Sequence, residues 1–321
     1  MATTAENGFK IEHLNVSYMS RGARVNALKD FSLSMKENES VGLLGESGAG
    51  KSTVGWAVLG MIEEPNIVTG SIGFGGENVL SMSKSELNEY RWKDAAMIFQ
   101  GSLNTLDPLT TVGRSLVELL MYKHFCKTKE EAQELSLKTL QVLGLGESTM
   151  DAYPHQLSGG MRQRVAIAMA ISTDPSMLIA DEPTTALDTI TQASILRLIS
   201  KLRYEKRIRN VLFISHDVAV HAFLADRVIV MFRGRSVEEG STKEVVKNPL
   251  HPYTKLLMSS VRIDSSKEAV IAPLGEEESS ERGCPYLNYC PHAMAVCADS
   301  FPEVTTVTEG HTVACFLYGG K

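Results

Sequence analysis

Short apolar runs alternate with helix-like segments along most of the chain. Residues 9–18 alternate between apolar and polar positions, which is typical of a β-strand, and a second strand is expected at 27–35. The runs at 41–44, 177–180 and 211–215 are short and apolar, as in strands buried inside a sheet, and each leads into glycine or polar residues. Such strands separated by helices predict an α/β fold with a largely parallel sheet.

Helices fill the intervals between these strands. We expect helices after Gly50 and at 84–93, 159–172 and 190–202, and two more within 112–145, where few strand-forming residues predict a helical subdomain. The remaining strands are expected at 71–74, 95–100, 228–231 and 235–239, the last two as a hairpin. Residues 263–283 are polar and rich in Ser and Glu, so they predict a linker that leads into a short C-terminal tail.

Composition is that of an ordinary globular protein and argues against two classes. The chain has 321 residues, is 43% hydrophobic and carries a net charge of −6, so there is no electrostatic case for nucleic-acid binding. The basic cluster at 201–209 is interrupted by Glu205 and is interpreted as the solvated end of a helix. No stretch approaches the roughly eighteen apolar residues that cross a bilayer, and no signal peptide is recognisable, so we expect a cytoplasmic protein.

The strongest motif, at 45–52 directly after an apolar run, reads GESGAGKS and fits the phosphate-loop pattern G-x-x-x-x-G-K-S/T. Glycines let the backbone turn its N–H groups toward a phosphate, and the helix that begins there adds the positive end of its dipole. Lys51 would bind the β- and γ-phosphates of a nucleotide, and the Ser52 hydroxyl would ligate Mg²⁺. The alternative is a glycine-rich turn that happens to precede a lysine, which the preceding strand disfavours. The predicted nucleotide contacts are Gly45, Glu46, Ser47, Gly48, Ala49, Gly50, Lys51, Ser52 and Thr53.

Two adjacent carboxylates follow the apolar run at 177–180. In a parallel sheet they would lie at the same edge as the phosphate loop, because the carboxyl ends of the strands meet there. Asp181 would hold Mg²⁺ through water, and Glu182 would orient and deprotonate an attacking water. An apolar run before Asp-Glu is common and weak by itself, so the pair gains its meaning from the phosphate loop upstream.

A third motif points to one family. Residues 157–164 read LSGGMRQR, where Ser-Gly-Gly at a helix start exposes N–H groups that bind anions, and Ser158 also suits a plain N-cap. The segment resembles the signature of the ABC ATPases, with Met161 where Gln is usual. The resemblance implies that Ser158, Gly159 and Gly160 contact ATP held by an opposing subunit.

Other elements of the ABC family can be matched one residue at a time. Gln100 matches the Q-loop glutamine, which in this family senses Mg²⁺ and the attacking water, and Asp188 matches the D-loop. His216 matches the switch histidine that contacts the γ-phosphate. Tyr18 matches the aromatic residue that stacks on adenine, with core packing as the alternative.

The resemblance covers residues 9–262 and implies the P-loop NTPase fold of the ABC ATPases. That fold is an α/β nucleotide-binding core with an N-terminal antiparallel β subdomain and an inserted helical subdomain, here at about 101–172. A linker and a small cysteine-containing C-terminal tail would occupy residues 263–321. Two such cassettes face each other head to tail, each ATP lying between one phosphate loop and the partner's signature.

Three segments, 99–108, 180–188 and 248–254, resemble the peptide importer branch, the oligopeptide and dipeptide permeases. The resemblance implies a heterodimer with a second ATPase subunit at the cytoplasmic face of the membrane, two transmembrane permeases and an external solute-binding protein. An oligosaccharide or nickel importer is the alternative. A soluble ABC ATPase of translation or DNA repair is disfavoured, because the chain has one phosphate loop and no room for a long coiled coil between Gln100 and Leu157.

Four of the five cysteines, Cys284, Cys290, Cys297 and Cys315, crowd into the tail. In the reducing compartment expected for this chain, clustered cysteines favour a metal site over disulfides. Their intervals of five, six and seventeen residues are wider than zinc sites usually have. The peptide importer branch carries this cysteine pattern, and some members bind an iron-sulfur cluster of the 4Fe-4S type with it. We therefore expect iron-sulfur, with zinc or no metal as the alternatives.

Overall fold

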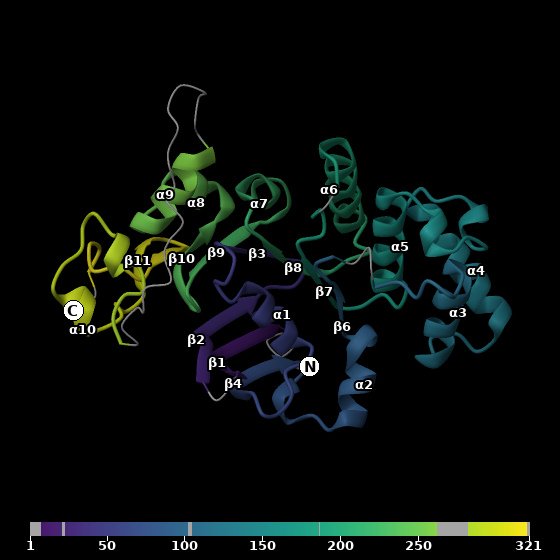
Figure 1. Ribbon diagram of the computed structural model, residues 1–321, viewed down its shortest axis with the longest axis horizontal. Coiled ribbons are helices and arrows are strands. Elements are labelled where there is room, and N and C mark those ends of the chain that lie inside the picture. Colours follow the sequence, from purple (N-terminus) through teal and green to yellow (C-terminus); the bar gives the residue numbers. More distant parts are fainter. Residues whose placement is uncertain (1–7, 21–22, 102–104, 186, 262–281, 320–321) are drawn as a thin grey trace, which may run out of the picture.

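The computed structural model describes residues 8–20, 23–101, 105–185, 187–261 and 282–319. The strands within these ranges form two sheets (Figure 1). The strands of the smaller sheet are β1 Phe9–Ser20, β2 Ala23–Met35, β4 Ile67–Phe74 and β5 Glu77–Asn78, in the order β2-β1-β4-β5. Those of the larger sheet are β3 Ser40–Leu44, β6 Ala95–Ile98, β7 Met177–Asp181, β8 Asn210–Ser215, β9 Arg227–Phe232, β10 Arg235–Ser241, β11 Thr305–Thr308 and β12 His311–Val313. Their order is β11-β12-β10-β9-β3-β8-β7-β6.

The predicted helices are present within a few residues of their expected bounds. The helices are α1 Lys51–Val58, α2 Lys84–Lys93, α3 Val112–Tyr122, α4 Lys129–Val142, α5 Gly159–Ile171, α6 Thr189–Tyr204, α7 Val218–Leu224, α8 Thr242–Lys247, α9 Pro252–Val261 and α10 Val296–Asp299. Thr111 and Thr128 cap α3 and α4, because each side chain accepts a backbone N–H of the first turn. These two helices lie at one end of the molecule in Figure 1. Within the described ranges, no helix is long and apolar enough to cross a membrane.

The central strands are apolar throughout because both faces of the larger sheet are covered. Along β7, Met177 and Ile179 pack in one core with α1 and the smaller sheet. Leu178 and Ala180 point to the opposite face and pack in a second core with α5 and α6. The smaller sheet is antiparallel, as the sequence predicts, and two of its strands begin four residues before their expected starts, β2 at Ala23 and β4 at Ile67.

Four parallel strands bring the predicted site residues to one edge. β3 pairs in parallel with β8, β8 with β7, and β7 with β6. Since parallel strands run in one direction, their carboxyl ends lie side by side. The phosphate loop follows β3 and His216 follows β8. Asp181 and Glu182 stand at the end of β7, and Gln100 comes shortly after β6. We call this set the catalytic edge.

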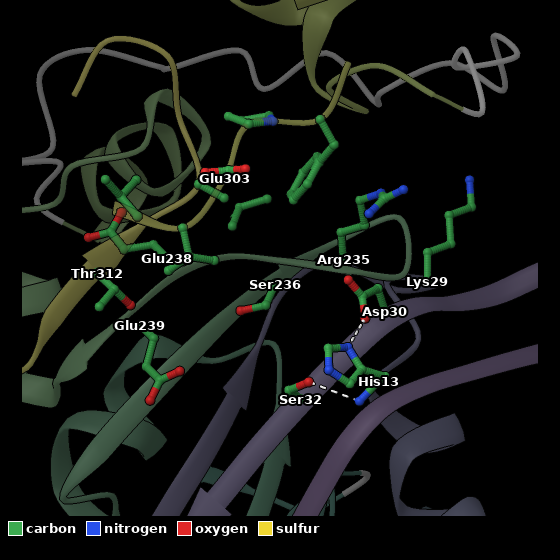
Figure 2. Close-up of a pocket in the computed structure, with 16 residues that line it drawn as sticks. His13, Lys29, Asp30, Ser32, Arg235, Ser236, Glu238, Glu239, Glu303 and Thr312 are labelled. Carbon is green, nitrogen blue, oxygen red and sulfur yellow. Dashed lines mark hydrogen bonds and ion pairs between the residues drawn. The ribbon is translucent and has the colours of Figure 1, made fainter. Parts of the chain in front are cut away.

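The tail continues the larger sheet, which the sequence analysis does not predict. β12 pairs antiparallel with β10, and β11 pairs with β12. The tail also faces the smaller sheet across a cavity of about 530 Å³. Figure 2 shows His13 and Asp30 on the side of the smaller sheet and Glu303 and Thr312 on the side of the tail. The predicted boundary at 262 and the linker at 263–283 lie outside the described residues, apart from residues 282 and 283.

Candidate active site

The phosphate loop curls around the side chain of Lys51. The Lys51 ammonium is almost wholly buried and donates hydrogen bonds to the carbonyl oxygens of Gly45, at 2.7 Å, and Glu46, at 2.8 Å. Burial lowers the pKa of Lys51, while the negative charges of Glu182, Asp181 and Glu46 oppose that shift. The loop therefore holds one buried positive charge, which a phosphate group could bind in place of the two carbonyl oxygens.

At two positions of this loop, Gly45 and Gly50, a larger residue would clash with neighbouring backbone atoms. A Cβ on Gly45 would lie 2.3 Å from the carbonyl oxygen of Met231. Gly50 precedes α1 with φ 96°, and its Cβ would lie 2.5 Å from the carbonyl oxygen of Ala27. The loop therefore lies directly against β2 and β9, which fixes where its amides point.

Asp181 ends β7 next to Ser52. Burial raises the pKa of the Asp181 carboxyl, and a side-chain hydrogen bond with Ser52 and the charge of Lys51 oppose the rise. Oδ1 of Asp181 is buried and has no hydrogen-bond partner among the described residues. An orphaned carboxylate oxygen beside a serine hydroxyl is a donor set that suits a hard cation such as Mg²⁺.

The other two predicted catalytic residues, Gln100 and His216, both contact the carboxylate of Glu182. Its Oε1 lies 2.7 Å from Nδ1 of His216, and its Oε2 accepts hydrogen bonds from Nε2 of Gln100, at 3.1 Å, and Oγ1 of Thr185, at 2.8 Å. Burial alone would raise the pKa of the Glu182 carboxyl, but the bonds to His216 and Thr185 and the charge of Lys51 hold it below its ordinary value. Glu182 has φ 44°, an uncommon backbone conformation for a non-glycine residue and one that clusters at functional sites.

The signature segment lies elsewhere in the same chain. Ser158 caps α5 and accepts the Met161 N–H at 3.3 Å, so the N-cap interpretation is confirmed. A Cβ on Gly160 would lie 2.7 Å from Cγ2 of Thr191, the residue that Asp188 bonds in capping α6. Asp188 accepts both the Thr191 N–H, at 2.9 Å, and the Thr191 hydroxyl, at 2.6 Å. Among the described residues, these contacts join the signature to α6 and not to the phosphate loop.

The Tyr18 ring packs partly against the core shared by the smaller sheet and α1. Its hydroxyl is buried and finds no hydrogen-bond partner in the described part of the chain. Adenine stacking on this half-buried ring stays a prediction.

Two residues that the sequence analysis did not single out support the catalytic edge. Thr185 donates a hydrogen bond to Glu182, and its place three residues after Glu182 is the signal that could have found it. His221 is buried, and its Nε2 bonds the carbonyl oxygen of Ser215, which directly precedes His216. Burial lowers the pKa of His221 to about 4, so the ring is neutral and donates that bond. No local motif marks His221.

Comparisons with known proteins identify the family of the chain. Residues 28–185 match the ABC transporter family, and residues 237–297 match the C-terminal region of oligopeptide/dipeptide transporters. The oligopeptide transport ATP-binding protein OppD of Escherichia coli is 39% identical over 95% of this chain and 92% of its own. The dipeptide transport ATP-binding protein DppD of Bacillus subtilis is 37% identical over 97% of this chain and 95% of its own. The chain belongs to this family of ABC transporter ATP-binding proteins.

The fold of this ABC ATPase also matches solved structures. A dimeric structure of the ATP-binding cassette MJ0796 bound to ADP and Pi is 31% identical, with a TM-score of 0.65 over 73% of this chain and 98% of that chain. The predicted ABC ATPase fold, with its antiparallel β subdomain, is thereby confirmed. The ABC ATPase hydrolyses ATP to drive transport.

The four tail cysteines of this ABC ATPase converge on one cavity of about 20 Å³. Burial raises the pKa of Cys284 to about 11 and also raises those of Cys290 and Cys315. Four thiols around one point are the donor set of an iron-sulfur cluster. Within the described ranges, however, no three His, Cys, Asp or Glu side chains are arranged as metal ligands. The four thiols are of the right chemical type for such a cluster, but the cavity between them is too small to hold one in this arrangement.

Proposed function

We propose that this ABC ATPase binds ATP with Mg²⁺ at the catalytic edge and hydrolyses it with Glu182 as general base. The observation that carries the proposal is the Glu182 carboxylate, which contacts Gln100, Thr185 and His216 at once. Because its pKa lies below the ordinary value, this carboxylate is ionised at neutral pH and can take a proton from water. His216 is proposed to contact the γ-phosphate and Gln100 to orient the attacking water.

The oxygen atoms proposed for Mg²⁺ are the Ser52 hydroxyl, the Asp181 carboxylate, acting through water, and the Gln100 amide. The buried, partnerless Oδ1 of Asp181 beside Ser52 supports this assignment. Bound there, Mg²⁺ would supply positive charge against the phosphate oxygens. Lys51 would exchange its bonds to Gly45 and Glu46 for bonds to the β- and γ-phosphates.

The functional unit is proposed to be a heterodimer with a second, similar ATPase subunit. Ser158, Gly159 and Gly160 would then contact ATP bound by the partner, and the partner's signature would contact ATP at this phosphate loop. Two observations support this: among the described residues the contacts of the signature lead to α6, and the similar cassette MJ0796 is described as dimeric. The N–H groups at the start of α5 are suited to a phosphate.

The dimer is proposed to drive two transmembrane permeases at the cytoplasmic face of the membrane, supplied by an external solute-binding protein. The names of the relatives OppD and DppD support a peptide as the solute. An oligosaccharide or nickel importer would use the same ATP site. The identity of the external binding protein distinguishes these solutes.

Copurification from native membranes tests the transporter assignment. We expect a second ATPase and two permeases to purify with the full chain, and a peptide-loaded binding protein to accelerate ATP hydrolysis by the complex. An active ATPase that purifies without any membrane protein would contradict this function.

For the tail, Cys284, Cys290, Cys297 and Cys315 are proposed to hold an iron-sulfur cluster of the 4Fe-4S type in a structural or regulatory role. Their thiol chemistry and their shared cavity support the proposal, which requires this cavity to widen around the cluster. Anaerobic purification followed by iron and sulfide analysis should give about four irons per chain. Zinc in place of iron, or protein free of both, would contradict it.

A further inference from the structure

A tyrosine outside the ATP-site motifs holds the start of the phosphate loop. The backbone N–H of Glu46 donates a hydrogen bond of 3.0 Å to the hydroxyl of Tyr253. Tyr253 lies at the start of α9, in the segment at 248–254 for which the sequence analysis assigns no role, and its side chain is wholly buried. The loop binds phosphate through the direction of its backbone N–H groups, so a fixed contact at its second residue helps to set its shape.

Tyr253 is itself fixed by bonds that lead back to the larger sheet. Its backbone N–H donates to Nδ1 of His251 at 3.1 Å. The His251 N–H donates to Oε2 of Glu238, a buried residue of β10, at 2.7 Å. The ring packs on Phe232 of β9, with ring centroids 4.6 Å apart. These contacts with β9 and β10 therefore hold the Tyr253 hydroxyl in a fixed position beside the phosphate loop.

On its other side, Tyr253 is packed by the cysteine tail. The ring of Tyr286 lies 5.5 Å from that of Tyr253 and 5.3 Å from that of Phe232, edge to face in the second case. Tyr286 is buried, follows Cys284 by two residues and lines the same small cavity as the four cysteines. A single aromatic cluster thus connects the tail to the phosphate loop.

The tail reaches the loop by a second route, through the turn between β9 and β10. The Gly234 N–H donates to the carbonyl oxygen of Ala49 within the phosphate loop at 3.0 Å. On the tail side, the Arg233 guanidinium donates to the Tyr289 hydroxyl at 3.2 Å, and Arg235 lies 4.4 Å from the centre of the Phe301 ring. The loop is therefore held at Glu46 and at Ala49 by groups that the tail also contacts.

We propose that Tyr253 is a positioning residue for ATP binding, whose hydroxyl fixes the Glu46 amide, and that Tyr286 of the tail keeps Tyr253 in place. Tyr253 acts through the phosphate loop and does not touch the nucleotide. The inference rests on the ATP site and requires no metal in the tail. It gives the tail a role in this ABC ATPase: its packing determines how well the phosphate loop holds ATP.

The first test removes the Tyr253 hydroxyl and keeps the ring. We expect Tyr253→Phe in the full chain to raise the Kd for ATP, and in the transporter complex the KM for ATP, by about three- to tenfold, the range of one lost hydrogen bond. The kcat should change by less than about twofold, because the loop binds the phosphates in both ground and transition states.

The matched control is Tyr90→Phe. Tyr90, on α2, is also buried, its hydroxyl has no hydrogen-bond partner among the described residues, and it packs in a different core cluster from Tyr253. We expect its ATP affinity to be unchanged. If Tyr253→Phe binds ATP as tightly as the unaltered chain, or if Tyr90→Phe weakens binding equally, the positioning role of Tyr253 is overturned.

The second test removes the contribution of the tail. We expect Tyr286→Leu to raise the Kd for ATP by about two- to fivefold, because the lost ring frees Tyr253, and to add little to Tyr253→Phe in the double variant. Tyr318→Leu is the control: Tyr318 also ties the tail to the core, through Leu250 and Lys255, without packing on Tyr253. ATP affinity unchanged in Tyr286→Leu, or weakened equally in Tyr318→Leu, overturns the role of Tyr286.

Discussion

The catalytic edge and the C-terminal region, residues 237–258 and 282–319, bring their functional groups together by different means. At the catalytic edge, each group directly follows a parallel strand, so the strand order places it. In the C-terminal region, Glu238, Tyr253, Tyr286 and His311 meet through antiparallel strand addition and ring packing. Local motifs therefore mark the first region, whereas contacts between distant residues make the second.

The two regions also differ in how their charges are surrounded. His216 and Gln100 are exposed beside Glu182, so solvent can reach the reacting groups. The side chains of Glu238 and His311 are 0% and 2% exposed and lie 2.8 Å apart. Removing one member of a charged pair should therefore change the stability little at the catalytic edge and strongly in the C-terminal region.

The largest expected effect on stability comes from Glu238→Leu. The Glu238 carboxylate accepts hydrogen bonds from the backbone N–H groups of Leu250 and His251 and from Nε2 of His311, and leucine would remove this acceptor from all three, two of which are buried. We expect unfolding to become easier by about 3 to 5 kcal/mol, measured by urea denaturation. Glu303→Leu, at an exposed position of the tail, is the control and should change stability by less than about 0.5 kcal/mol.

Gly45→Ala should disturb the catalytic edge directly. The new Cβ would lie 2.3 Å from the carbonyl oxygen of Met231, so the phosphate loop must move. Overpacking of this kind has a penalty of about 1 to 3 kcal/mol, and we expect ATP affinity to fall by more than about tenfold. Gly73→Ala is the control, since its Cβ would lie 3.7 Å from the nearest atom. Equal ATP affinity in both variants would show that the loop tolerates the methyl group.

Acid should destabilise both regions through one buried histidine in each. Burial lowers the pKa of His221, and that of His251, to about 4, from the ordinary 6.5. Between these pH values the unfolded chain binds more protons than the folded chain. The contribution of each histidine to stability is therefore fully present above pH 6.5 and is lost as the pH falls toward 4. We expect a loss of about 2 kcal/mol per histidine at about pH 5.

Urea denaturation at about pH 7.5 and pH 5 measures this loss. His221→Gln and His251→Gln should each reduce the difference between the two pH values. A difference that neither substitution alters would assign the acid sensitivity to other groups.

The smallest effect is expected from Ser158→Ala. The substitution removes the cap of α5 and should destabilise the chain by about 1 kcal/mol. Thr128→Ala removes the corresponding cap of α4 and should have a similar effect on stability. Because the proposed heterodimer uses Ser158 to contact ATP, slower hydrolysis in the complex is expected for Ser158→Ala alone. Equal rates for the two variants would leave Ser158 as a plain N-cap.

The sequence predicts the catalytic edge well because its signals are local. The apolar run at 177–180 marks a strand covered on both faces, and the acids that follow it need no further information to be placed. The Glu46–Tyr253 bond joins residues 207 positions apart, and no periodicity reports it. β11 escapes prediction because its residues are largely exposed and Thr-rich, and its place is fixed by pairing with β12 on β10.

The role of Glu182 as general base is the central claim, and ATP hydrolysis by the Glu182→Gln variant of the purified complex tests it most directly. The amide keeps the shape of the side chain and cannot accept a proton, so we expect turnover to fall at least about a hundredfold while ATP remains bound. Glu205→Gln, the same change at the end of α6, should hydrolyse ATP at the normal rate. Normal turnover in Glu182→Gln would contradict the claim.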